Sequence, residues 1–258
     1  RKSSNQQTGK GTKGLGRIRG KRWRGGGAIR TMDMGLVLKY LDDLSENNNR
    51  EWYHAHKVES EAACTQFEEL VRTPIFRIGE FDSTILHNQA EDCIFKLVRY
   101  PRFGPDRSPF NPSFRAHISV QGKRPVPVGY YLMIRPGGQS FLRGGLSTNM
   151  FRDATVMIRD YIAEHGDEFG EIIHSPEFLK YFAVQGTALK NVPAGYDKEH
   201  PQAEYLKFKS WYLKYPVADE ALNDSEVFIE ETVRLFRIMK PFNDYLNKAL
   251  DGFQMPAR

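Results

Sequence analysis

The chain has 258 residues, of which 40% are hydrophobic and 27% are charged, a composition typical of a soluble globular protein with one or two domains. The net charge of +5 is unevenly spread: residues 1–31 hold ten Lys and Arg and no acid, whereas residues 32–258 hold 27 basic and 32 acidic residues, a net charge of −5. No apolar run approaches the ~20 residues that a membrane-spanning helix needs.

Residues 1–33 form a basic, glycine-rich tail that we expect to be disordered, because it cannot bury enough surface to offset the entropy of ordering. Such a segment can hold nucleic acid weakly, so any RNA binding is expected through residues 1–31 and to fall with salt. The chain begins without Met, and the other interpretation is that this segment is not native. The rest, 34–254, is predicted to be a single domain.

From Met34 onward, the apolar residues recur with the period of a helix, which predicts a helix over 34–44. Asn47–Asn49 interrupt this pattern, and one of them is expected to cap a second helix over 50–71. Alternating residues and the turn at Pro136–Gly138 predict strands and a hairpin. The strands are expected over 92–99, 113–121, 129–135 and 139–143.

The second half of the chain reads mainly as helices, with one further strand near 209–215. Pro241 is expected to divide the C-terminal helix, because proline disrupts a helix interior. The helices are predicted near 150–164, 175–182, from 201, 224–239 and 241–251. Strands in the middle and helices at both ends predict an α+β fold with a central antiparallel or mixed sheet.

The most informative run is Arg99–Asn111, which places Arg99, Arg102 and Arg107 among three prolines and beside Asp106. The prolines exclude a helix and stiffen the loop. Guanidinium groups bind carboxylates and phosphates through paired N–H donors. The run is therefore either a site for an anion or a set of internal ion pairs.

A second segment, Leu189–Lys209, adds point charges and a titratable group. We predict that these side chains converge with the arginines around one concave anion site, within about 10 Å of a common point, roughly the width of one ligand. His200 and Asp106 would orient a donor or move a proton. The anion-binding candidates are Arg99, Arg102, Arg107, Lys190, Lys207, Lys209 and His200.

The alternative is structural: the arginines pair with Asp106, Glu51 and Asp197 and lock loops onto the sheet. The Asn47–Trp52 segment has the same two readings. Asn49, Arg50 and Trp52 either cap and pack a helix or form one wall of the anion site. The scattered histidines have no ligand spacing and predict no metal site. Cys64 and Cys93 have no redox spacing, and the absence of a secretory signal leads us to expect a cytoplasmic location.

Three segments resemble a known family. Asn47–Tyr53 is similar to the signature N-N-N-R-E-W-F, Arg99–Asn111 to R-D-x-R-F-S-x-D-K-x-P-Y-K, and Leu189–Lys209 to L-K-x-x-P-x-G-[FY]-x-x-x-H-P-x-x-x-x-L-x-x-K. These motifs are those of the conserved family designated domain of unknown function 2461, and the resemblance covers about 36–253. It implies no reaction or ligand. The chain departs from the family motif at Tyr100, Gly104–Pro105, Arg107 and Asn111, so two basic side chains are lost from the loop.

These observations favour a protein that binds an anionic small molecule bearing a phosphate or carboxylate through the Arg/Lys-rich loop site. Two alternatives stay open: an RNA-associated protein acting through the basic tail, and an enzyme acting on a phosphorylated metabolite. The sequence specifies no reaction, cofactor or oligomeric state.

Overall fold

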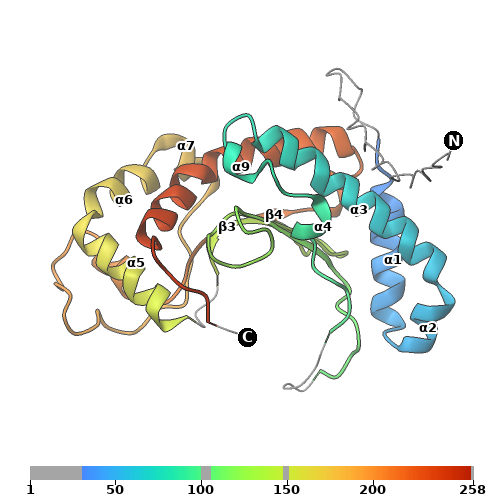
Figure 1. Ribbon diagram of the computed structural model, residues 1–258, viewed down its shortest axis with the longest axis horizontal. Helices are drawn as coiled ribbons and strands as arrows, with labels where there is room; N and C mark the ends of the chain where they lie inside the picture. Colours follow the sequence, from blue (N-terminus) through green and yellow to red (C-terminus); the bar gives the residue numbers. More distant parts are fainter. Residues whose placement is uncertain (1–30, 100–105, 148–150, 257–258) are drawn as a thin grey trace, which may run out of the picture. The chain divides into compact units, whose positions relative to one another are not determined.

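The computed structural model describes residues 31–99, 106–147 and 151–256. Within these ranges the chain has an α+β fold, in which an antiparallel sheet packs against N- and C-terminal helices (Figure 1). The strands are β1 (Phe114–Ile118), β2 (Tyr130–Ile134), β3 (Ser140–Leu146) and β4 (Trp211–Val217), and they lie in that order across the sheet. Every neighbouring pair is antiparallel.

The helices of the first half precede the sheet in the chain, and those of the second half lie mostly between β3 and β4. The first group is α1 (Met34–Glu46), α2 (Arg50–Ala55), α3 (Lys57–Ile78), the 3-10 turn η1 (Ser83–Ile85) and α4 (Ala90–Cys93). The second group is α5 (Arg152–Glu164), α6 (Gly166–Ile173), α7 (Pro176–Tyr181), α8 (Ala203–Leu206), the 3-10 turn η2 (Asp219–Leu222) and α9 (Ser225–Ala249).

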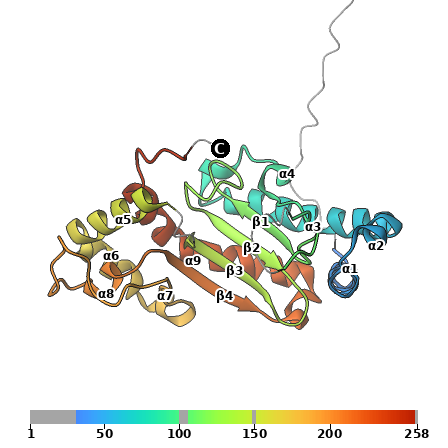
Figure 2. The ribbon, with the colours of Figure 1, turned by 90° about the horizontal axis from the view of Figure 1, so that it is seen from below.

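Helices α3 and α9 cover one face of the sheet (Figure 1). Alternate strand residues point into this layer and are buried, among them Phe114, Leu132, Leu142 and Leu213. Gly144 lets α9 approach closely, since a Cβ there would lie 2.9 Å from the Asn243 side chain. Seen from below, no described helix lies over the other face (Figure 2).

Most of the predicted elements are confirmed. The first helix, the strands over 113–121, 129–135 and 209–215, and the hairpin to β3 all form. Asn49 caps α2, as its Oδ1 accepts a hydrogen bond of 2.8 Å from the backbone N–H of Trp52. Pro176 lies in the first turn of α7, where its missing N–H is not needed.

Three predictions were wrong. Residues 92–99 are not a strand: α4 ends at Cys93, and only isolated bridges at Ile94 and Val98 follow. The helix predicted over 50–71 is two helices, α2 and α3, and the second continues to Ile78. Pro241 lies inside the continuous helix α9, because buried residues on both sides of it hold the helix against the sheet.

Candidate functional site

The arginine loop and the Asn47–Trp52 segment lie side by side. The Asn48 amide donates a hydrogen bond of 3.0 Å to the Phe110 carbonyl, and the Phe110 N–H donates one of 3.1 Å to the Asn48 Oδ1. The rings of Tyr53 and Phe110 stack with their centroids 4.2 Å apart. Two motifs that are some 60 residues apart in the chain therefore form one surface.

A polar pocket of about 340 Å³ opens at this junction, and we call it the loop pocket. Arg99 pairs there with Asp106. Hydrogen bonds from the Ser108 hydroxyl and backbone N–H, with a further one from Arg99, hold the pKa of Asp106 well below its usual range. The lining residues are Ser45, Asn48, Arg99, Asp106, Ser108, Asn111, Pro112 and Arg135. The loop thus contains one of the internal ion pairs that the structural alternative predicted.

Three other residues predicted near this pocket do not line it. Arg107 and Arg50 are exposed, and Trp52 stacks on His56 at 4.0 Å between ring centroids. Arg102 lies outside the described residues. Across the described ranges, neither Glu51 nor Asp197 forms an ion pair with an arginine.

The structure does not bring the lysine segment Leu189–Lys209 together with Arg99 and Arg107. The arginine loop leads into β1, and the lysine segment leads into β4. Three antiparallel steps separate these strands, so β1 and β4 run in opposite directions. Their entry points therefore lie at opposite ends of the sheet.

At that far end, the predicted residues have local partners. The Lys207 ammonium lies 2.5 Å from a carboxylate oxygen of Glu204. The His200 Nδ1 accepts a hydrogen bond of 3.0 Å from the backbone N–H of Gln202. Asp197 accepts one from the N–H of Glu199, and Lys190 is exposed. The Lys209 backbone N–H donates to the Thr187 carbonyl, and the Lys209 carbonyl accepts a hydrogen bond from the Thr155 hydroxyl. Helix α8, which follows His200, has only four residues.

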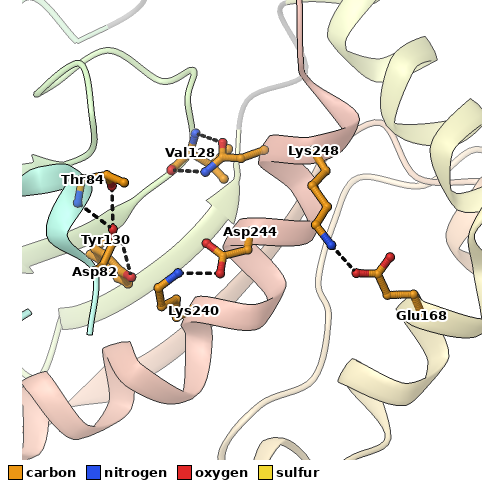
Figure 3. A network of polar contacts seen from close by, with 9 residues as sticks. Asp82, Thr84, Val128, Tyr130, Glu168, Lys240, Asp244 and Lys248 are labelled. Carbon is orange, nitrogen blue, oxygen red and sulfur yellow. Dashed lines mark hydrogen bonds and ion pairs between the residues drawn. The ribbon is translucent and has the colours of Figure 1, made fainter. Parts of the chain in front are cut away.

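A larger cavity of about 660 Å³, the helix cavity, lies between α9, the η1 turn and the residues leading into β2 (Figure 3). Its two lysines are paired within the protein: Lys240 with Asp244 at 2.5 Å, and Lys248 with Glu168 at 2.6 Å. The Tyr130 hydroxyl donates a hydrogen bond of 2.9 Å to Asp82. Burial, and to a smaller degree Asp82, raises the pKa of Tyr130 far above its usual range.

Two asparagines of α9 complete this network by holding the sheet. The Asn247 amide makes reciprocal hydrogen bonds of 2.8 and 3.0 Å with the backbone of Val128. Asn243 is buried, accepts a bond of 2.7 Å from the N–H of Gly145 and donates one of 3.1 Å to the carbonyl of Gly129. The polar groups of the helix cavity are thus used to fasten α9 to β2 and β3.

The sheet face away from α3 and α9 carries basic side chains that have no carboxylate partner in the four strands. Its outward residues Arg115, Tyr131, Phe141, Arg143, Tyr212 and Lys214 define what we call the open face. Register places Tyr131 beside Arg143, and Arg143 directly opposite Lys214. Side chains at such facing positions have Cβ atoms about 5 Å apart. Two cations on neighbouring strands therefore face each other.

Aromatic rings from three strands surround Arg143. Its guanidinium carbon lies 4.6 Å from the ring centre of Phe141, 5.0 Å from that of Tyr212 and 5.6 Å from that of Tyr131. The Lys214 ammonium lies 4.7 Å from the ring centre of Phe141. Cation–π contacts hold the two cations in place but leave their charge unneutralised.

The open face has no opposing charge. The four strands contain no Asp or Glu. Arg115, Arg143 and Lys214 form no ion pair in the described part of the chain. The Nε–H groups of Arg115 and Arg143 are buried and have no acceptor there. Burial lowers the pKa of Arg143.

The sequence reasoning missed Arg115 and Arg143. Both lie inside predicted strands, where an isolated arginine is an ordinary outward residue. The available signal was a basic residue two positions after an aromatic residue in each of two predicted strands: Arg143 after Phe141, and Lys214 after Tyr212. Only the register shows that two of the cations are opposite each other.

The comparisons identify the family. The family model described as conserved hypothetical protein (DUF2461) matches residues 36–245. The chain belongs to this family. The DUF2461 match includes the loop pocket, the open face and most of α9. Neither the curated proteins nor the solved structures that were searched contain a match. Among the described helices, none is long and apolar enough to cross a membrane.

Proposed function

We propose that this DUF2461 protein binds an anionic small molecule on the open face, at Arg143 and Lys214, with Arg115 and Tyr131 beside them. One observation carries the proposal: two cations face each other across neighbouring strands that contain no carboxylate. Like charges at facing positions destabilise a sheet. A bound anion removes this repulsion and accepts charge-assisted hydrogen bonds from the two cations.

The loop pocket supports the proposal less well. Arg99 is already paired with Asp106, so its charge is largely neutralised within the protein. Arg135 is the other cation lining that pocket. The open face offers more uncompensated positive charge than the pocket that the sequence predicted.

The test is thermal stabilisation of the full chain by phosphate and by citrate, each compared with sodium chloride at the same ionic strength. A ligand that binds only the folded state raises the melting temperature. We expect Arg143→Gln and Lys214→Gln to abolish the stabilisation. Lys198→Gln is the matched control, because Lys198 is exposed in the loop between α7 and α8 and the substitution removes the same charge.

Arg99→Gln distinguishes the two candidate sites. If it abolishes the stabilisation while Arg143→Gln does not, the anion binds in the loop pocket and the open-face proposal is wrong. Equal stabilisation of all variants would reject both sites.

The ten basic residues within 1–31 favour a second, separate activity, the weak binding of nucleic acid. Such binding depends on released counterions and falls steeply with salt. Replacing these ten residues with Gln in the full chain should abolish RNA binding. Retention of RNA binding by that variant would contradict this proposal.

A further inference from the structure

The open face also specifies the chemistry of the anion, and this step rests on the proposed function. We infer that the recognised group is the dianionic phosphate of a small phosphate monoester. The alternatives of matching charge are sulfate, a tetrahedral dianion, and a dicarboxylate, whose two groups are planar. The charge count and the directions of the donors favour a tetrahedral dianion over a dicarboxylate, and measured affinities distinguish a phosphate monoester from sulfate.

The charge count favours a dianion. Arg143 and Lys214 are directly opposite each other, and Arg115 on β1 faces Met133, which makes it a diagonal neighbour of Tyr131. The charges of Arg115 and Arg143 both act to lower the pKa of Tyr131, although burial is the larger effect and raises it. Tyr131 lies beside Arg143, whose guanidinium carbon is 5.6 Å from the Tyr131 ring centre, and diagonally across from Arg115. A monoanion would neutralise only one of these three cations.

The donor directions favour a tetrahedral group. Donors come from three different strands: the Tyr131 hydroxyl from β2, the Arg143 guanidinium from β3 and the Lys214 ammonium from β4. Neighbouring strands lie about 4.8 Å apart, so the three donors approach from separate directions. A carboxylate offers two oxygens in one plane, which suits a single guanidinium fork. A phosphate offers three oxygens that point in different directions.

The side chains keep their donors available. The rings of Phe141, Tyr131 and Tyr212 hold the Arg143 guanidinium, so little rotamer freedom is lost when a ligand binds. In the described ranges, the Tyr131 hydroxyl makes no hydrogen bond to protein. Lys214 is exposed, and its ammonium has three rotatable donors.

The experiment measures the affinity of the full chain for four anions at constant ionic strength by calorimetry, at pH 5.5 and pH 7.5. The probes are glycerol 3-phosphate, inorganic phosphate, sulfate and malonate, with glycerol as the neutral control. The second pKa of a phosphate monoester is about 6, so its dianionic fraction rises about fourfold between these pH values. Sulfate and the side chains of Arg, Lys and Tyr do not titrate in this range. The neighbouring His117 is buried and has its pKa lowered to about 4, also outside the range.

We expect the affinity for glycerol 3-phosphate to rise about fourfold from pH 5.5 to pH 7.5, and that for sulfate to stay constant. Malonate should bind at least ~10-fold more weakly, the equivalent of one lost charge-assisted hydrogen bond. Arg143→Gln and Lys214→Gln should each weaken phosphate binding by ~10-fold or more, and Lys198→Gln should not. Lys214 is exposed, so its variant remains informative if Arg143→Gln fails to fold.

The outcomes separate the two proposals. If malonate binds as tightly as glycerol 3-phosphate and both are lost in Lys214→Gln, the open face is an anion site but the inference of a phosphate is wrong. If inorganic phosphate or sulfate binds as tightly as glycerol 3-phosphate, the site recognises a free tetrahedral ion, which overturns the inference of a phosphate ester. If no anion binds, or binding survives both open-face substitutions, the proposed function is wrong as well.

Discussion

The helix cavity lies beside α9 and the start of β2, whereas the open face lies on the side of the sheet away from α9, and the two regions differ in how their charges are compensated. Around the helix cavity, Lys240 and Lys248 each have a carboxylate partner. On the open face, Arg143 and Lys214 face each other with none. Charges that are paired internally hold elements together, whereas charges left uncompensated on a rigid sheet are available to a ligand. Our proposal therefore places the ligand on the open face and not in the larger helix cavity.

The largest expected effect is on the paired side, at Asn243. Asn243→Ala leaves the Gly145 N–H and the Gly129 carbonyl without their partner in a buried position. Unsatisfied buried groups cost about 1–3 kcal/mol each, so we expect the free energy of unfolding to fall by about 4 kcal/mol. Urea denaturation measures this, with Asn191→Ala on an exposed loop as the control. If Asn243→Ala lowers the free energy of unfolding less than Asn191→Ala does, the network does not hold α9 to the sheet.

The next effect concerns pH and lies on β1, at His117. Burial lowers the pKa of His117 to about 4, whereas an unfolded histidine titrates near 6.5. The unfolded chain therefore binds the proton more tightly, and stability falls as the pH decreases from about 6.5 to 4. We expect this histidine alone to remove up to about 3 kcal/mol across that window.

His117→Gln should flatten this pH dependence, measured by urea denaturation at pH 7 and at pH 4.5. His87→Gln is the control, because His87 is exposed on a neighbouring loop. If the free energy of unfolding depends on pH as strongly in His117→Gln as in the unsubstituted protein, the imidazole is protonated in the folded protein at pH 4.5.

Local signals predicted much of the fold. The Asn49 cap, the proline in the first turn of α7 and the hairpin between β2 and β3 each depend on a few adjacent residues. The errors arose where packing overrides such signals. Pro241 did not end α9, because Phe242 and its buried neighbours on the same helix hold it against the sheet.

The candidate site was harder to predict, because it depends on topology. The Arg99 loop and the Lys207 segment are both basic, but they lead into strands that run in opposite directions. Arg143 and Lys214 are some 70 residues apart in the chain and become neighbours only through the β3–β4 register. No local pattern shows that register, so the sequence alone could not indicate that these two cations are neighbours.

The smallest expected effect compares the two regions most directly, because the coupling free energy between two charged side chains should have opposite signs in them. A double-mutant cycle isolates the interaction between two side chains and cancels other losses, such as the contact of Lys214 with Phe141. For Arg143 and Lys214, each changed to Gln, we expect a repulsive coupling of about 0.5 kcal/mol. For Lys240 and Asp244, changed to Gln and Asn, we expect an attractive coupling of about 0.4 kcal/mol, typical of a partly exposed helical pair.

Both couplings should shrink at high salt, because the charges are near the surface. Adding glycerol 3-phosphate should change only the open-face cycle, because the anion lies between the two cations and converts their repulsion into shared binding. The helix-cavity cycle should stay constant, as its charges are already neutralised. An attractive coupling between Arg143 and Lys214 without any ligand would mean that the protein itself compensates their charge. The open face would then resemble the helix cavity, and the reason for placing a ligand there would be lost.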